Sequence, residues 1–102
     1  MNILSVTKSV VVKNPQGLHA RPADMLVRAA SQFQCDITIA RVGQDAGANG
    51  EAVDCKSILS LLTLGATQGT ELSLSANGAD ADHAAQCIEQ LFESGFSELE
   101  AT

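Results

Sequence analysis

The chain has 102 residues, of which 45% are hydrophobic, and this suffices for one modest core but not for two. Six Lys and Arg against twelve Asp and Glu give a net charge of −6, which disfavours nucleic acid and anionic membranes as partners. Neither a signal peptide nor an apolar run of roughly 18 residues is apparent, so we expect one soluble, cytoplasmic, monomeric domain over residues 1–102, with its core at 5–93.

The first third of the chain predicts a strand followed by a helix. From Ser5 to Lys13 valines alternate with polar residues, as in a strand with one buried face, and the turn residues at 14–17 end it. Apolar residues then recur at steps of three and four, which predicts an amphipathic helix from about Ala20 to Phe33. Because Pro22 disfavours helical angles at Arg21, the regular helix can start as late as Pro22.

The middle of the chain predicts two strands, a loop and a short helix. Alternation indicates a strand from Cys35 to about Val42 and a short return strand from Glu51 to Cys55. Between them, Gly43 to Gly50 is rich in Gly, Ala, Asp and Asn and exceeds a tight hairpin, so we expect a mobile loop. The pattern from Ser57 to Leu64 predicts a short helix that Gly65 ends in a left-handed conformation.

The last third predicts a strand and a helix. Leucine and alanine alternate with polar residues from Thr70 to Ala76, which marks a strand with one wet face. Asn-Gly at 77–78 is typical of a turn. An apolar stripe from Ala81 to Phe92 indicates a helix that Asp80 or Asp82 caps.

This order of elements predicts the fold class. Strand, helix, strand, strand, short helix, strand and helix fit an α+β fold in which the helices gather on one face of a sheet. We therefore expect an open-faced two-layer sandwich with four mostly antiparallel strands and three helices. The tail at 95–102 should be flexible.

His19 lies where the first strand joins the first helix. The first turn of a helix leaves backbone N–H groups without internal partners, and these amides, with the helix dipole, attract phosphate. An imidazole nitrogen held there can attack phosphorus. Arg21 adds a planar cation suited to a phosphoryl group, and Gly17 permits a turn that keeps His19 accessible. On position alone, however, a solvated or capping histidine is the commoner role.

The segment Gly-Leu-His-Ala-Arg-Pro-Ala at 17–23 resembles the phosphorylation-site signature of HPr, the histidine-containing phosphocarrier family of the bacterial phosphotransferase system. The resemblance runs in order from about Ser5 to Glu93 and implies that family's sandwich fold. It implies that His19 accepts a phosphoryl group, through the ring nitrogen nearer the main chain, from enzyme I, which phosphoenolpyruvate charges. His19 would pass the group to sugar-specific or regulatory components without a cofactor or metal. The implied phosphate-binding residues are Gly17, Ala20 and Arg21.

A second segment, Cys55 to Gly69, is similar to the family's other signature. There a serine at the start of the short helix is phosphorylated by a regulatory kinase, HPr kinase/phosphorylase, and Ser57 occupies that position. Serine is also a preferred helix N-cap, worth about 1 kcal/mol. A regulatory and a purely structural role for Ser57 therefore both stay open.

The short helix carries more apolar residues than it can bury. Consecutive helical residues are turned by roughly 100° from one another, so some of its Ile and Leu side chains must be exposed. In the family this helix and the first helix dock enzyme I and acceptor proteins. The implied partner contacts are Arg28, Ile58, Leu59 and Leu62.

The remaining cysteine and histidine residues predict no further chemistry. Cys35, Cys55 and Cys87 lie far apart without Cys-x-x-Cys spacing, so we expect reduced, structural thiols. With His19 and His83 as the only imidazoles, no metal site is expected. His83 should simply be exposed.

Three functions compete at this point. The first is a phosphocarrier for sugar uptake or for a phosphorelay such as a nitrogen branch. The second is a non-catalytic effector that binds a transcription regulator when Ser57 is phosphorylated, but the intact His19, Arg21 and Pro22 favour the first. A self-contained hydrolase is disfavoured because no motif-borne base accompanies His19. Departures from the family at Gln16 and in the long loop leave the physiological partners open.

Overall fold

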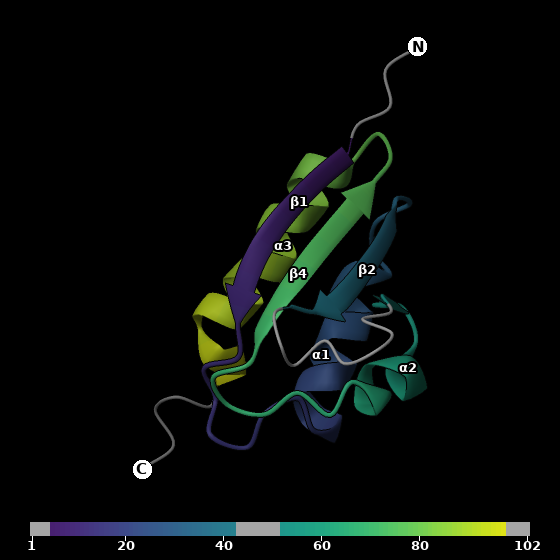
Figure 1. Ribbon diagram of the computed structural model, residues 1–102. Helices are drawn as coiled ribbons and strands as arrows, with labels where there is room; N and C mark the ends of the chain where they lie inside the picture. The colour runs from purple at the N-terminus through teal and green to yellow at the C-terminus, as the bar shows by residue number, and fades with distance from the viewer. Residues whose placement is uncertain (1–4, 43–51, 98–102) are drawn as a thin grey trace.

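The computed structural model describes residues 5–42 and 52–97. Within them, a four-stranded sheet has the strand order β1-β4-β2-β3, and every pairing is antiparallel. Its strands are β1 (Ser5–Val11), β2 (Asp36–Arg41), β3 (Val53–Asp54) and β4 (Glu71–Asn77). The helices are α1 (Ala20–Ala30), α2 (Ile58–Thr63) and α3 (Ala81–Glu93). They lie on one face of the sheet (Figure 1), which confirms the predicted open-faced α+β sandwich.

The core lies between the sheet and the helices. Leu72 and Leu74 of β4 are fully buried, and the register sets Leu72 opposite Val10 of β1 and Leu74 opposite Ile39 of β2. Because side chains alternate along a strand, these residues share one face. Helix α3 covers that face with its own buried residues, which are Ala81, Ala84, Ala85, Ile88 and Phe92.

Helix α1 begins at the predicted Ala20 but ends before the predicted Phe33. It begins at Ala20 rather than Pro22, because Pro22 lies in the first turn, where the missing N–H costs no internal hydrogen bond. It ends at Ala30, after which Gln32 and Phe33 make hydrogen bonds to carbonyls three residues back. Such bonds tighten and close a helix end.

The other elements match their predicted positions within a few residues. Strand β2 and helix α2 are each one residue shorter at both ends than predicted, and β4 is shifted by one residue. Gly65 has φ +60°, which confirms the left-handed end of α2. The predicted loop at 43–50 lies outside the described residues, as does Glu51 of the predicted return strand.

The chain beyond α3 is ordered further than predicted. Gly95–Ser97 forms a 3-10 turn in which Gly95 and Phe96 are buried. The Phe96 ring packs edge-on against Phe92, with ring centroids 5.0 Å apart. Burial of an aromatic ring outweighs the cost of the positive φ of Phe96. The predicted flexible tail is therefore wrong for 95–97, while 98–102 lies outside the described residues.

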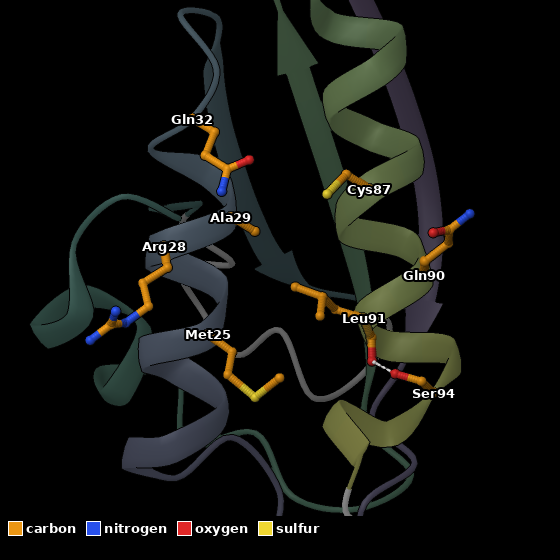
Figure 2. A pocket seen from close by; sticks show the side chains of 8 residues that line it. All are labelled: Met25, Arg28, Ala29, Gln32, Cys87, Gln90, Leu91 and Ser94. Atoms are coloured by element: carbon orange, nitrogen blue, oxygen red, sulfur yellow. Dashed lines mark hydrogen bonds between the residues drawn. The ribbon is translucent and has the colours of Figure 1, made fainter.

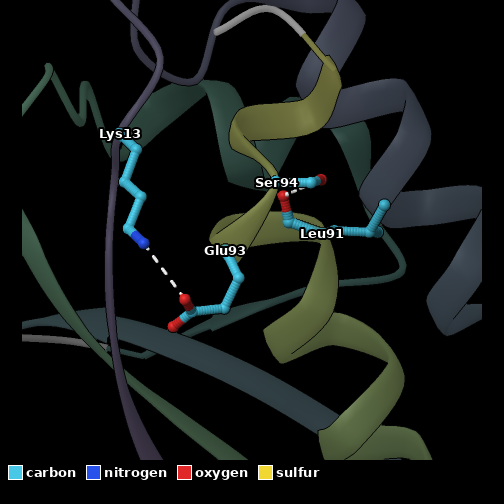
Figure 3. A network of polar contacts seen from close by, with 4 residues as sticks. All are labelled: Lys13, Leu91, Glu93 and Ser94. Carbon is cyan, nitrogen blue, oxygen red and sulfur yellow. Dashed lines mark hydrogen bonds and ion pairs between the residues drawn. The ribbon is translucent and has the colours of Figure 1, made fainter.

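Ion pairs tie α3 to the first strand and the segment that follows it. Lys13 Nζ lies 3.0 Å from Glu93 Oε1 (Figure 3), and Lys8 Nζ lies 3.4 Å from Glu89 Oε1. Solvent reaches both pairs and screens them, so they add little to stability. No described helix has the length and apolar character needed to cross a membrane.

The three cysteines are free, as the sequence predicts. Burial raises the pKa of the Cys35 thiol to about 11, and the neighbouring Asp80 carboxylate adds to this effect. Burial likewise raises the pKa of Cys55 to about 12. Both thiols are therefore protonated and unreactive at neutral pH.

Asp80 precedes α3, as predicted, but its side chain does not cap that helix. Its carboxylate instead accepts hydrogen bonds from the backbone N–H groups of Gln34 at 2.9 Å and Cys35 at 3.0 Å. The Gln34 N–H, followed by the Cys35 thiol, lowers the pKa of Asp80 below its usual value. Asp80 thus links the start of β2 to the turn before α3.

Replacing Asp80 by asparagine should reduce stability at neutral pH but much less in acid. Because the pKa is lower in the folded than in the unfolded state, the contribution of Asp80 is complete above about pH 4 and is lost as pH falls through the folded pKa. Urea unfolding at several pH values should show that the free energies of unfolding of wild type and Asp80→Asn converge below pH 4. Exposed Asp36 offers the control, since its carboxylate accepts no hydrogen bond within the described ranges and Asp36→Asn should differ little from wild type in stability at neutral pH. A pH-independent difference for Asp80→Asn would contradict the assignment.

Candidate functional site

His19 occupies the N-cap position of α1, with an extended backbone. Its carbonyl accepts the first helical hydrogen bond, from Ala23 N–H at 3.0 Å, and its own N–H donates to the Gly17 carbonyl at 3.0 Å. The imidazole is half-buried and does not act as a helix cap. The ring therefore stands at the helix end with part of its surface open to solvent.

The first turn of α1 has few backbone donors. Ala20 and Arg21 precede the first internal hydrogen bond, which comes from Ala23 N–H, so their amides have no acceptor within the helix. Pro22 has no N–H to offer. The Arg21 side chain is exposed and makes no ion pair with any residue in the described ranges. The two amides that follow His19 directly, with a guanidinium two residues along the chain, are a suitable set of donors for an oxyanion.

A hydrogen-bonded turn before His19 fixes the approach to the helix. Gly17 N–H donates to the Asn14 carbonyl at 3.1 Å, and Asn14 Nδ2 donates to the Gly17 carbonyl at 2.7 Å. Asn14 is fully buried. The sequence marked Asn14 only as a turn residue, although asparagine before a Pro-x-Gly turn often bonds to nearby backbone.

The segment after α2 supports this turn from the side, a contact that no sequence pattern predicts. Leu18 N–H donates to the Ala66 carbonyl at 3.0 Å. Gly17 has φ +71°, and a Cβ atom on it would lie 2.4 Å from the Ala66 carbonyl oxygen and 3.0 Å from Thr67 Cα. Only glycine fits such a close backbone approach. The predicted role of Gly17 in the turn gains a steric basis.

The second predicted segment also lies at a helix start. Ser57 is the N-cap of α2, and its Oγ accepts a hydrogen bond from Ser60 N–H at 3.3 Å. Along this helix Leu61 is buried, whereas Ile58, Leu59 and Leu62 are 37%, 73% and 39% exposed. These three side chains form an exposed apolar patch, which we call the α2 patch.

Helix α2 packs against α1, so the α2 patch lies on an element beside the His19 helix (Figure 1). Arg28, the other predicted contact, is exposed on α1. Its Nε lies 2.8 Å from Asp24 Oδ2, one helical turn earlier. A partner can therefore bind Arg28 by displacing Asp24. This costs little free energy, because the ion pair is exposed.

A groove of about 580 Å³ lies between α1 and α3. Figure 2 shows Met25 and Ala29 of α1 facing Cys87 and Leu91 of α3 across it. The groove is lined by none of the predicted phosphate-binding residues. The sequence did not predict it, because it depends on how two helices pack. Among the described residues, no group of three or more His, Cys, Asp or Glu could hold a metal ion.

One protein-family model matches most of the chain. The model, described as the PTS HPr component phosphorylation site, matches residues 6–94. The chain belongs to the HPr family of the phosphotransferase system. The resemblance inferred from residues 17–23 and 55–69 is thereby confirmed.

Individual relatives agree with the family match. The chain is 39% identical over 82 residues to the phosphocarrier protein HPr of Mycoplasma capricolum, covering 80% of this chain and 84% of that protein. It is 39% identical over 89 residues to the multiphosphoryl transfer protein of Escherichia coli O157:H7, covering 86% of this chain and 22% of the larger protein. The structure of HPr-C-His from Thermoanaerobacter tengcongensis superposes with a TM-score of 0.74 at 35% identity, over 96% of this chain and 98% of that one.

Proposed function

We propose that this protein carries a phosphoryl group on His19, accepting it from enzyme I and passing it to a sugar-specific or regulatory component. One observation carries the proposal: the family's phosphorylation-site motif lies at the N-terminus of α1, with a half-exposed His19 as N-cap. The relatives named as phosphocarrier and multiphosphoryl transfer proteins support the same role. Partial exposure suits a group that must meet two partners in turn.

The proposed step is an in-line displacement at phosphorus. A lone pair on the His19 ring nitrogen nearer the main chain forms the N–P bond, while the bond from phosphorus to the donor breaks and the donor keeps that electron pair. The amides of Ala20 and Arg21 and the Arg21 guanidinium bind the phosphoryl oxygens and stabilise their charge. The reverse sequence delivers the group to an acceptor, so the protein is a carrier and not by itself a turnover enzyme.

Incubation with phosphoenolpyruvate and enzyme I tests the proposal. Intact-mass analysis should show one added phosphate, and acid treatment should remove it, because a phosphorus–nitrogen bond on histidine is acid-labile. A known HPr serves as the control that the enzyme I preparation is active. If that control is charged while this protein stays unmodified by enzyme I from its own source, the carrier proposal is wrong.

We propose that the α2 patch and Arg28 form the docking surface for enzyme I. Leu59 is the most exposed of these apolar side chains, so Leu59→Ser should leave folding unchanged and raise the KM for charged enzyme I about tenfold, the effect of losing roughly 1.4 kcal/mol of contact. The matched control is Val11→Ser, which removes another exposed apolar side chain, on the outer face of the sheet. Equal KM values for wild type and Leu59→Ser would place docking elsewhere.

Regulatory phosphorylation of Ser57 by HPr kinase/phosphorylase, followed by binding of a transcription regulator, stays a prediction. The geometry supports the structural role, since the Ser57 hydroxyl already accepts a capping hydrogen bond. A phosphate there would be favoured by the helix dipole. Phosphopeptide mapping of protein isolated from its own cells tests the regulatory role, and absence of phospho-Ser57 under every carbon source would contradict it.

The capping role of Ser57 makes its own prediction. Ser57→Ala should lower the free energy of unfolding by about 1 kcal/mol, because the Ser60 N–H loses its acceptor. Ser60→Ala keeps that N–H and its bond, so it should be close to neutral. Urea denaturation of both variants provides the measurement, and equal losses would show that the cap contributes nothing.

A further inference from the structure

The side chain of Arg41, at the end of β2, reaches the segment that supports the His19 turn. Arg41 Nη1 donates a hydrogen bond to the Leu64 carbonyl at 2.8 Å. Leu64 is the C-cap of α2, and the next residue, Gly65, turns the chain with φ +60°. A cation at the C-terminal end of a helix is also favoured by the helix dipole. Arg41 therefore holds the end of α2 at the point where the chain leaves the helix.

From that point, two residues of chain lead to the turn before His19. The Ala66 carbonyl accepts the Leu18 N–H at 3.0 Å and lies in close contact with Gly17. Ala66 and Leu18 are both buried, so neither can move without disturbing the other. His19 follows Leu18 directly, and its own N–H is bonded to the Gly17 carbonyl. A displacement of the Leu64 carbonyl would thus pass through Ala66 to the backbone that carries the imidazole.

The environment of Arg41 suggests that stability alone does not explain the residue. Its Nε is buried and has no hydrogen-bond acceptor within the described residues. A buried donor without a partner costs free energy. The same side chain holds the Leu64 carbonyl in place, just before the segment that supports the His19 turn.

We infer that Arg41 is a positioning residue for phosphoryl transfer, acting through Leu64 and Ala66 on the orientation of His19. The inference rests on the proposed carrier function of His19. Arg41 itself does not contact the phosphoryl group. Arg41 instead affects how the His19 ring nitrogen is aligned with phosphorus. Transfer rates are sensitive to this alignment.

The test compares Arg41→Met with Lys56→Met and Arg41→Lys. Lys56 is the matched control, since its Nζ also donates to a backbone carbonyl, that of Phe33 at 2.9 Å, at the opposite end of α1. Hydrogen exchange of the Leu18 amide and the NMR shifts of the His19 ring are measured on unphosphorylated protein, with His83 as internal reference. The rate of transfer from charged enzyme I is measured separately, so a failure of the carrier proposal is distinguishable from a failure of this one.

We expect Arg41→Met to exchange the Leu18 amide about tenfold faster and to shift the His19 resonances but not those of His83. Transfer at saturating enzyme I should slow about tenfold with KM unchanged. Arg41→Lys should recover part of each effect, and Lys56→Met should show none. If Arg41→Met does not fold, Arg41→Gln replaces it, because its shorter amide fills space without reaching Leu64. A folded Arg41 variant whose Leu18 amide exchanges and whose His19 takes up phosphate at wild-type rates would overturn the inference. A uniform loss of amide protection across β4 would also overturn it, because it would show a general loss of stability.

Discussion

Replacement of His19 by glutamine is expected to abolish phosphate incorporation from phosphoenolpyruvate and enzyme I. Glutamine is polar and of similar length, but its amide nitrogen has no available lone pair with which to attack phosphorus. Since the imidazole does not cap α1, the fold should tolerate the change, and circular dichroism should match wild type. The expected result on intact-mass analysis is no added acid-labile phosphate.

The control for this experiment is the other histidine. His83 is exposed on α3, as predicted, where its ring also packs edge-on against Phe33 with centroids 5.4 Å apart. His83→Gln should be phosphorylated as wild type is, because nothing at that position resembles the first turn of α1. Phosphate retained by His19→Gln and lost by His83→Gln would move the acceptor to α3.

The fold was predictable because its signals are local and repetitive. Alternation over 70–76 and the three- and four-residue spacing over 81–92 each specify an element and its buried face. The position of β4 between β1 and β2 was not predicted, because every strand offers a similar apolar face. Helix ends were less predictable, as at Pro22, where the restriction on Arg21 competes with the tolerance of a first turn for proline. Phe96 was missed because its burial depends on contact with Phe92 and not on a periodic pattern.

The candidate site also has one part that sequence motifs predict and one part that they do not. His19, Arg21 and Ser57 could be found from motifs, since each lies at a helix start that the sequence marks. The Ala66 carbonyl beside Gly17 could not be found, because a backbone atom carries no signature and the two positions are far apart in the chain. For the same reason the contact from Arg41 to Leu64 required the folded structure. Sequence motifs therefore located the proposed reacting groups, and the structure located the contacts that support them.

Gly17→Ala is expected to be the most damaging single-methyl change at the site. At φ +71° an alanine pays about 1–2 kcal/mol for the left-handed conformation, and its Cβ would lie 2.4 Å from the Ala66 carbonyl oxygen. Displacing that carbonyl also weakens its hydrogen bond with Leu18 N–H, worth about 1 kcal/mol. The free energy of unfolding should fall by about 3 kcal/mol in urea denaturation.

Gly69→Ala separates conformational strain from the steric clash. Gly69 also has a positive φ, +89°, but a Cβ on it meets nothing within 4 Å. It should therefore lose only about 1–2 kcal/mol and retain its rate of phosphoryl uptake. The folded fraction of Gly17→Ala should instead take up phosphate at least about tenfold more slowly, because His19 follows the displaced turn. Equal losses of stability and rate in both variants would show that strain alone accounts for Gly17, and that the Ala66 contact does not orient the histidine.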